Sequence, residues 1–242
     1  MKQAKQHVFI NLLLLALGIA LILVGAMLFR YLSEYATDRK EAEELRQIAR
    51  QGSMKDPKSP IDFAALKEIN EDTVGWILAC GGEIDGPVVQ TTDNDFYLTH
   101  RFDKTEGSVG TFFADENARP AFDCSLTVVY GHNRKDGSMF HPLLNYKEEA
   151  YYKAHPTFTV YTEEGEKTYH IFSAFYADYW NIDAMEDDMD IALERSLYET
   201  KEAEKLRGNT ETTTQNNIVV LSTCEYSGDN NRMVVYGILT EE

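Results

Sequence analysis

The segment at residues 218–239 reads IVVLSTCEYSGDNNRMVVYGIL, with two apolar runs on either side of a polar loop. Residues 218–223 and 232–239 are rich in valine and isoleucine, which favour β-strands. Antiparallel pairing of the two runs would bring Cys224 and Arg232 to the same end of a sheet. The segment therefore predicts a β fold with a cysteine and an arginine at one rim.

Strand-like composition recurs in six further segments, at residues 74–79, 87–90, 109–113, 126–130, 157–162 and 167–177. The sequence Glu-Glu-Gly-Glu at 163–166 predicts a hairpin turn between the fifth and sixth strands. We expect a helix at residues 185–206, inserted between the sixth and seventh strands. Eight strands with few helices predict a mostly β fold, a closed or nearly closed eight-stranded β-barrel.

The N-terminal region contains an apolar run, because residues 8–29 carry no formal charge. As a helix this run would be about 33 Å long, enough to cross a hydrocarbon core of about 30 Å. A cleaved signal peptide is the alternative, but the run is longer than a usual signal-peptide core. Lys2 and Lys5 precede the run and Arg30 follows it, which favours a cytoplasmic N-terminus and an extracellular remainder.

Between the apolar run and the strands, the sequence predicts two helices. Residues 34–50 are charged and alanine-rich, and glycine and proline at 52, 57 and 60 would end that helix. Residues 61–69 have helical spacing, with Asp62 as the N-cap. We therefore expect a cytoplasmic tail at 1–7, a transmembrane signal anchor at 8–29, a helical stalk and linker at 30–60, and a folded domain at 61–242.

The composition excludes several classes of protein. The 242 residues contain 23 basic and 40 acidic side chains, and the formal charge of −17 argues against a partner that is nucleic acid. Residues 1–30 hold three bases and no acid, so the remaining 212 residues carry 20 bases against 40 acids, a charge of −20. Three cysteines cannot make a disulfide-rich scaffold.

A thiol is intrinsically nucleophilic, so the three cysteines are candidates for covalent catalysis. Cys224 follows an apolar strand, where a rigid element opens onto a loop. Cys80 and Cys124 lie in segments without a catalytic context, and we interpret both as packed or loop thiols. Cys224 is therefore the candidate nucleophile.

A cysteine nucleophile needs an acid–base partner and a group that stabilises an oxyanion. His132 follows the predicted strand at 126–130, whereas the settings of the other histidines favour surface or hydrogen-bonded roles. Arg232 begins the last strand, eight residues after Cys224, and its guanidinium keeps its charge. The alternative for Arg232 is an ordinary salt-bridged surface arginine.

Acidic clusters at residues 163–166 and 187–190 raise the question of a metal. Neither follows the ligand spacing of an EF-hand, and the sequence has no His-Glu-x-x-His zinc motif. We interpret both clusters as solvated charge, and we expect no metal and no cofactor.

Three motifs in this chain resemble those of the sortase family. Residues 220–224 (Val-Leu-Ser-Thr-Cys) resemble its cysteine signature, with Val220 in place of the usual threonine, a mild change because both residues suit strands. Residues 129–133 (Val-Tyr-Gly-His-Asn) resemble its histidine segment, and residues 231–235 its arginine strand. Two helices before the barrel and a helix-bearing insert are similar to class B sortases, and class B members need no metal.

The resemblance implies a membrane-anchored cysteine transpeptidase that cuts a C-terminal sorting signal after threonine. Cys224 would form a thioacyl-enzyme, His132 would transfer protons, and Arg232 with the backbone N–H of Glu225 would hold the oxyanion. Partners would be secreted proteins that bear a sorting motif and an amine of the peptidoglycan precursor. By family position the sorting signal would lie along a set of lining residues: Asn94, Leu98, Ser222 and Thr223, with residues 176–182 as another wall in which Tyr176, Tyr179 or Trp180 points inward.

Two alternatives remain open. The first is an anchored cysteine peptidase that hydrolyses cell-wall or surface peptides, with water in place of the amine. The second is a non-catalytic anchored binding module that keeps the fold and recruits secreted proteins. The peptidase differs from a transpeptidase because an added amine acceptor would not change its product. The binding module differs because its function would not need Cys224.

Overall fold

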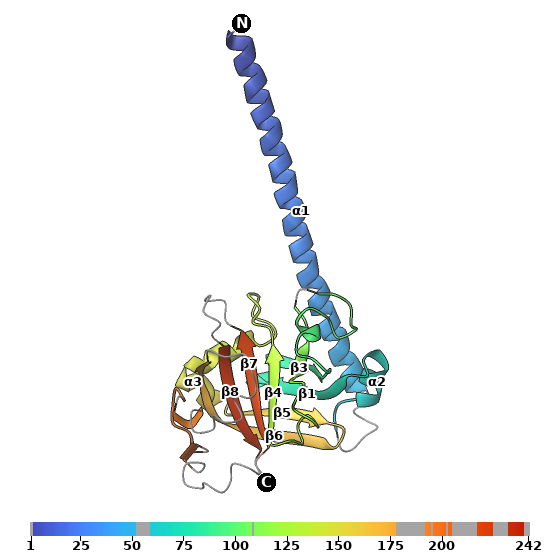
Figure 1. The fold of residues 1–242 in the computed structure, drawn as a ribbon, viewed down its shortest axis with the longest axis vertical. Helices are drawn as coiled ribbons and strands as arrows, with labels where there is room; N and C mark the ends of the chain where they lie inside the picture. The colour runs from blue at the N-terminus through green and yellow to red at the C-terminus, as the bar shows by residue number, and fades with distance from the viewer. Residues whose placement is uncertain are drawn as a thin grey trace. The chain divides into compact units, whose positions relative to one another are not determined.

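The computed structural model describes residues 2–51, 59–107, 109–177, 192–194, 196–201, 203–204, 217–224 and 232–239. The chain divides into two compact units, Met1–Glu43 and Glu44–Glu242. The first unit is helical, and the second contains the sheet (Figure 1).

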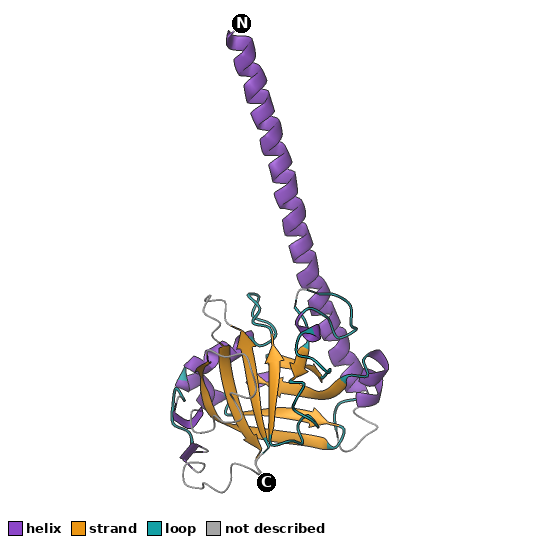
Figure 2. Cartoon of the chain, viewed as in Figure 1, coloured by secondary structure: helices purple, strands orange, loops and turns teal. Residues whose placement is uncertain are grey.

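Eight strands form a closed barrel in the second unit (Figure 2). Around the barrel the order is β1-β2-β3-β4-β7-β8-β6-β5, and β5 pairs with β1 to close it. The pairs β2–β3 and β4–β7 are parallel, and the remaining pairs are antiparallel. The strands are β1 (Thr73–Ala79), β2 (Ile84–Val89), β3 (Phe112–Ala114), β4 (Leu126–Gly131), β5 (Thr157–Thr162), β6 (Gly165–Ala177), β7 (Ile218–Cys224) and β8 (Arg232–Leu239).

The eight-stranded barrel predicted from the sequence is confirmed, and the bounds of β5 and β8 match the prediction. The prediction for β3 was wrong at its start, because the strand begins at Phe112 instead of residue 109. Gly110 has a φ of +69°, and a Cβ there would lie 2.1 Å from the Tyr97 carbonyl oxygen. The chain therefore turns tightly against residues 97–98 before it can extend. The β5–β6 turn is also tighter than expected, since Thr162 already pairs with Gly165.

The N-terminal helix α1 (Lys2–Gln51) is continuous, so the apolar run at residues 8–29 and the helix expected at residues 34–50 form one element. No glycine or proline interrupts residues 26–51, and Ser33 and Thr37 donate side-chain hydrogen bonds back to helix carbonyls. Within Phe9–Gln51 the helix is long and apolar enough to cross a membrane.

The remaining helices are short. Asp62 caps α2 (Phe63–Ile69) as predicted, because its Oδ1 accepts a hydrogen bond from the Ala65 N–H at 3.0 Å. Half of the helix expected at 185–206 lies outside the described residues. Of the described half, residues 192–194, 201 and 203–204 are helical and residues 196–200 are not, so the prediction of helix was wrong at 196–200. The others are α3 (Glu149–Ala154) and the 3₁₀ helices η1 (Cys80–Gly82), η2 (Phe96–Leu98) and η3 (His141–Lys147).

The buried apolar side chains form two clusters, on the two faces of the curved sheet. One cluster draws residues from all eight strands, so it fills the barrel interior. The other cluster joins Trp76, Val128, Val220 and Val234 to residues of α2 and of the end of α1, so it covers the outer face. Because side chains alternate along a strand, neighbouring residues of β7 belong to different clusters.

The end of α1 is packed onto the barrel within the second unit. Leu45 and Ala49 are buried in the outer cluster. Asp85 of β2 forms ion pairs with Arg46 and Arg50, and its Oδ1 accepts a hydrogen bond from the Trp76 indole at 2.8 Å. The last turns of α1 therefore belong to the fold of the barrel.

We predict that the fragment 52–242, which lacks the end of α1, is less stable than the fragment 31–242, which retains it. The apolar surface covered by Leu45 and Ala49 would be exposed, and the buried Asp85 would lose both cations. The loss should be about 3 kcal/mol, which lowers Tm by roughly 6–12 °C for a domain of this size. Thermal unfolding of the fragments 31–242 and 52–242 measures this loss of stability. Equal Tm values for the two fragments would contradict the prediction.

Candidate active site

The strand register brings the three predicted catalytic positions to one rim of the barrel. Gly131 at the end of β4 pairs with Thr223 of β7, and Cys224 pairs with Arg232 of β8. His132 follows Gly131 directly, so positions 132, 224 and 232 come next to one another across three adjacent strands. Neighbouring strands lie about 5 Å apart, so the backbone positions of these three residues lie within about 10 Å of one another.

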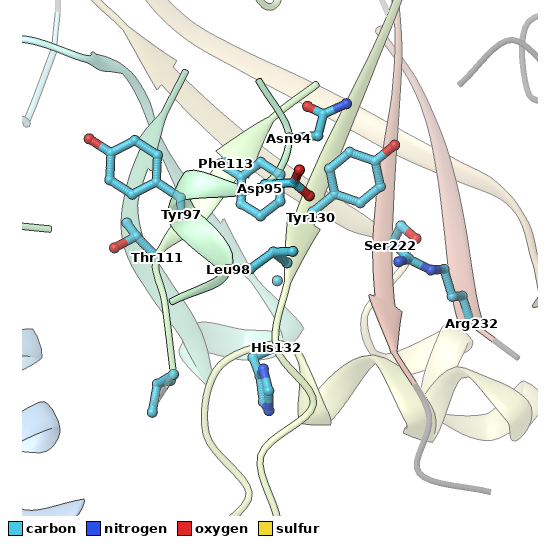
Figure 3. A pocket seen from close by; sticks show the side chains of 12 residues that line it. Asn94, Asp95, Tyr97, Leu98, Thr111, Phe113, Tyr130, His132, Ser222 and Arg232 are labelled. Atoms are coloured by element: carbon cyan, nitrogen blue, oxygen red, sulfur yellow. The ribbon is translucent and has the colours of Figure 1, made fainter. Parts of the chain in front are cut away.

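A groove opens beside this rim, with a volume of about 160 Å³ (Figure 3). It contains five of the residues predicted from the sequence, namely Asn94, Leu98, His132, Ser222 and Arg232. The other lining residues are Asp95, Tyr97, Val109, Thr111, Phe113, Tyr130 and Gly131. The Cys224 side chain, Glu225 and residues 178–182 of the expected second wall lie outside the part of the chain that is described.

Ser222 and Thr223 differ in where their side chains lie. Ser222 lines the groove, is fully buried, and has no hydrogen-bond partner for its hydroxyl among the described residues. Thr223 is also fully buried, but it does not line the groove, because alternation along β7 turns it to the other face.

Arg232 is 4% exposed, so the alternative of an ordinary surface arginine is wrong. Its guanidinium carbon lies 5.4 Å from the centre of the Tyr130 ring, over the face of that ring. This is within the range of a cation–π contact. A fixed positive charge therefore lies at the groove, on the strand position paired with Cys224.

His132 is half-buried at the base of a hairpin loop. Burial, and after it the positive charge of Arg134, lower the pKa of its imidazole below the usual value. Arg134 is itself buried and forms an ion pair with Asp136 at 3.2 Å. The Asn133 side chain hydrogen-bonds His141 at 2.7 Å, and the His132 carbonyl accepts from the Phe140 N–H. The loop is thus fixed, and the neutral imidazole is favoured.

The two other cysteines have the packed or loop settings predicted for them. Cys80 is buried, and burial raises the pKa of its thiol to about 12, so it is not a thiolate at neutral pH. Cys124 is partly buried and donates to the Leu126 carbonyl at 3.0 Å. Among the described residues no cluster of His, Cys, Asp or Glu could hold a metal ion.

Sequence reasoning missed part of the groove. Tyr130 lies in the motif at residues 129–133, but no function was predicted for it. It is two positions before His132, so alternation along the strand puts both positions on the same face. Tyr97 of η2, Thr111 and Phe113 of β3 were not predicted to line the groove, because their segments are brought to the site only by tertiary contacts. Asp115, which bonds both Asn94 and Tyr130, follows β3 and was likewise not predicted.

The comparisons with known proteins agree with this geometry. The family described as "Sortase domain" matches residues 82–240. Sortase B of Listeria monocytogenes is 34% identical over 180 residues, covering 72% of each chain, and sortase B of Staphylococcus aureus is 27% identical over 237 residues, covering 94% and 95%. A structure of Bacillus anthracis sortase B in complex with AAEK1 superposes with a TM-score of 0.72 at 28% identity, over 87% of this chain and all of that one.

The closed barrel and its rim, together with these matches, show that the chain belongs to the sortase family. Within that family it is a class B sortase, and thus a cysteine transpeptidase, as its curated relatives and structural neighbours establish.

We predict that the pKa of His132, measured by NMR titration, lies below 6.5 and rises in Arg134→Gln. Removing the guanidinium removes a repulsion against the imidazolium, and it also leaves the Asp136 carboxylate to favour that cation. The matched control is Lys135→Gln, which deletes an exposed cation one residue further along. An equal rise in both variants would show that Arg134 has no specific effect.

Proposed function

We propose that this class B sortase cleaves a C-terminal sorting signal after threonine and transfers the new carboxyl group to a cell-wall amine. The strand register that joins positions 132, 224 and 232 at one rim is the observation that carries the proposal. A structure of the S. aureus sortase B–substrate complex, 26% identical with a TM-score of 0.72, supports the proposal that this fold binds a substrate.

In the first half-reaction, the Cys224 thiolate attacks the carbonyl carbon of the threonine. The oxyanion that develops is held by the Arg232 guanidinium and the Glu225 backbone N–H. His132, as the imidazolium, gives its proton to the departing amine as the C–N bond breaks. The products of this step are a thioacyl-enzyme and the released C-terminal fragment.

In the second half-reaction, an amine of the peptidoglycan precursor attacks the thioester. The neutral His132 takes the proton from that amine, and the C–S bond breaks to return the Cys224 thiolate. The imidazolium and thiolate with which the first half-reaction began are thereby regenerated as the amide forms, so no other reactant is consumed. The low pKa of His132 favours the neutral imidazole needed at this stage.

The sorting signal would lie along the groove. Leu98 offers an exposed apolar surface, Asn94 an amide, and Ser222 a buried hydroxyl, all on the face that holds Arg232. Thr223 would act through its backbone rather than its side chain. We further propose that α1 anchors the enzyme in the membrane with its N-terminus in the cytoplasm and the barrel outside the cell, facing the wall of a Gram-positive envelope.

We predict a bell-shaped dependence of kcat/KM on pH. Cleavage needs the Cys224 thiolate together with the His132 imidazolium. As the pH increases, the rate therefore rises when the Cys224–His132 pair loses its first proton and falls when the pair loses its second. Because the pKa of His132 is lowered, the acidic limb should lie below pH 6.5. A profile of kcat/KM that only rises or only falls between pH 5 and pH 10 would contradict the assignment of Cys224 and His132 as the reacting pair.

The decisive experiment incubates the fragment 31–242 with a panel of sorting-motif peptides and detects an acyl adduct on Cys224 by mass. Cys224→Ala should abolish the adduct, and His132→Ala should lower cleavage by roughly 100-fold or more. Cys124→Ala, which deletes a thiol outside the groove, is the matched control. Retained cleavage in Cys224→Ala would overturn the proposal.

The same assay separates the alternatives. With an added amine acceptor, a transpeptidase yields a ligated product, whereas a peptidase that uses only water yields the hydrolysed peptide at an unchanged rate. A non-catalytic binding module would retain peptides without cleaving them, and Cys224→Ala would not change its affinity.

A further inference from the structure

A buried carboxylate, Asp115, lies behind the groove at the end of β3. The residue is 1% exposed, yet four donors surround its two oxygens. Four hydrogen bonds match the full accepting capacity of a carboxylate. This degree of satisfaction explains how a negative charge is accommodated inside the protein.

The two oxygens of Asp115 have different neighbours. Oδ1 accepts from the backbone and the side-chain N–H groups of Asn117, at 2.9 and 3.2 Å, which holds the carboxylate within its own turn. Oδ2 accepts from the Asn94 amide at 2.8 Å and from the Tyr130 hydroxyl at 3.0 Å, and both of these residues line the groove. One oxygen therefore fixes the carboxylate, and the other fixes two parts of the groove.

The backbone around Asp115 is equally constrained. Its N–H donates to the Val128 carbonyl of β4 at 2.9 Å, and its carbonyl accepts from the Gln90 side chain at 2.7 Å. The Asn94 oxygen accepts in turn from the Glu116 N–H at 2.9 Å, so both ends of the Asn94 amide are engaged. The amide of Asn94 is thus held in one orientation with respect to the groove.

Tyr130 connects this carboxylate to the buried cation. The Tyr130 hydroxyl donates to Asp115, and the face of its ring carries the Arg232 guanidinium at 5.4 Å. A phenol that donates to a carboxylate becomes more electron-rich, which strengthens the attraction between its ring and a cation. Figure 3 shows Asn94, Tyr130 and Arg232 along this side of the groove.

We propose that Asp115 is a positioning residue that aligns both functional parts of the groove. Through Tyr130 it holds the guanidinium of Arg232 where the oxyanion develops, and directly it holds the amide of Asn94 against the peptide. This inference rests on the proposed roles of Arg232 and Asn94. Asp115 itself contacts no reacting atom.

The test measures kcat and KM for peptide cleavage by the full chain in detergent. Tyr130→Phe deletes only the hydroxyl and should lower kcat about threefold to tenfold with KM nearly unchanged. Asn94→Ala should raise KM with kcat nearly unchanged, and Asp115→Asn should do both. Tyr146→Phe is the matched control, because it deletes a buried hydroxyl that donates to the His155 carbonyl away from the groove.

The double variant Asp115→Asn with Tyr130→Phe tests whether both changes break one connection. Its kcat should equal that of Asp115→Asn alone, since the same hydrogen bond is lost in each. Multiplied losses, or an unchanged kcat in Tyr130→Phe, would overturn the inference. The Tm of each variant is measured so that kcat can be corrected for the fraction of folded protein. If Asp115→Asn does not fold, Tyr130→Phe alone tests the inference.

Arg232→Gln separates this inference from the proposed function. A large loss of kcat in Arg232→Gln with none in Tyr130→Phe would overturn only the role of Asp115. Full activity in Arg232→Gln would overturn the oxyanion role of Arg232 and, with it, the reason for positioning that residue.

Discussion

The parallel pairing of β4 with β7 is the constraint on which the site depends. Parallel neighbours end at the same edge of a sheet, so residues that follow β4 meet residues that end β7. His132 and Cys224 are separated by about 90 positions, more than enough for the crossover of about a dozen residues that a parallel pair requires. The antiparallel return of β8 then adds Arg232 to the same rim.

Two buried charges near this rim have partners of different kinds. Arg232 is covered by the Tyr130 ring, and Asp115 is surrounded by donors. A buried charge without partners would cost several kcal/mol, so these contacts are part of the stability of the fold as well as of the groove. The side chain of Asp85, which is 8% exposed, is likewise paired with two cations at the end of α1, far along the chain from the catalytic motifs.

Much of the fold could be predicted from the sequence, because strands rich in valine and isoleucine have a local signature. The late start of β3 has a local physical cause, because Gly110 delays the strand. An unbroken run of helix-compatible residues continues the apolar helix through residues 34–50 as α1. The catalytic candidates could also be predicted, since each lies in a recognisable motif at a strand end. The connection from Asp115 to Tyr130 could not, because it joins two residues whose neighbours along the chain give no sign of it.

The sequence by itself determined the apolar helix, the set of strands, and the thiol, imidazole and guanidinium to which we assign the chemistry. These are properties of residue type and short-range pattern, which need no knowledge of distant contacts. Only the tertiary structure decided the register of β4 against β7, the burial of Arg232 on Tyr130, and the opposite faces of Ser222 and Thr223. Closure of the barrel fixes which strands become neighbours, and a shift of one residue in that pairing would turn every side chain to the other face.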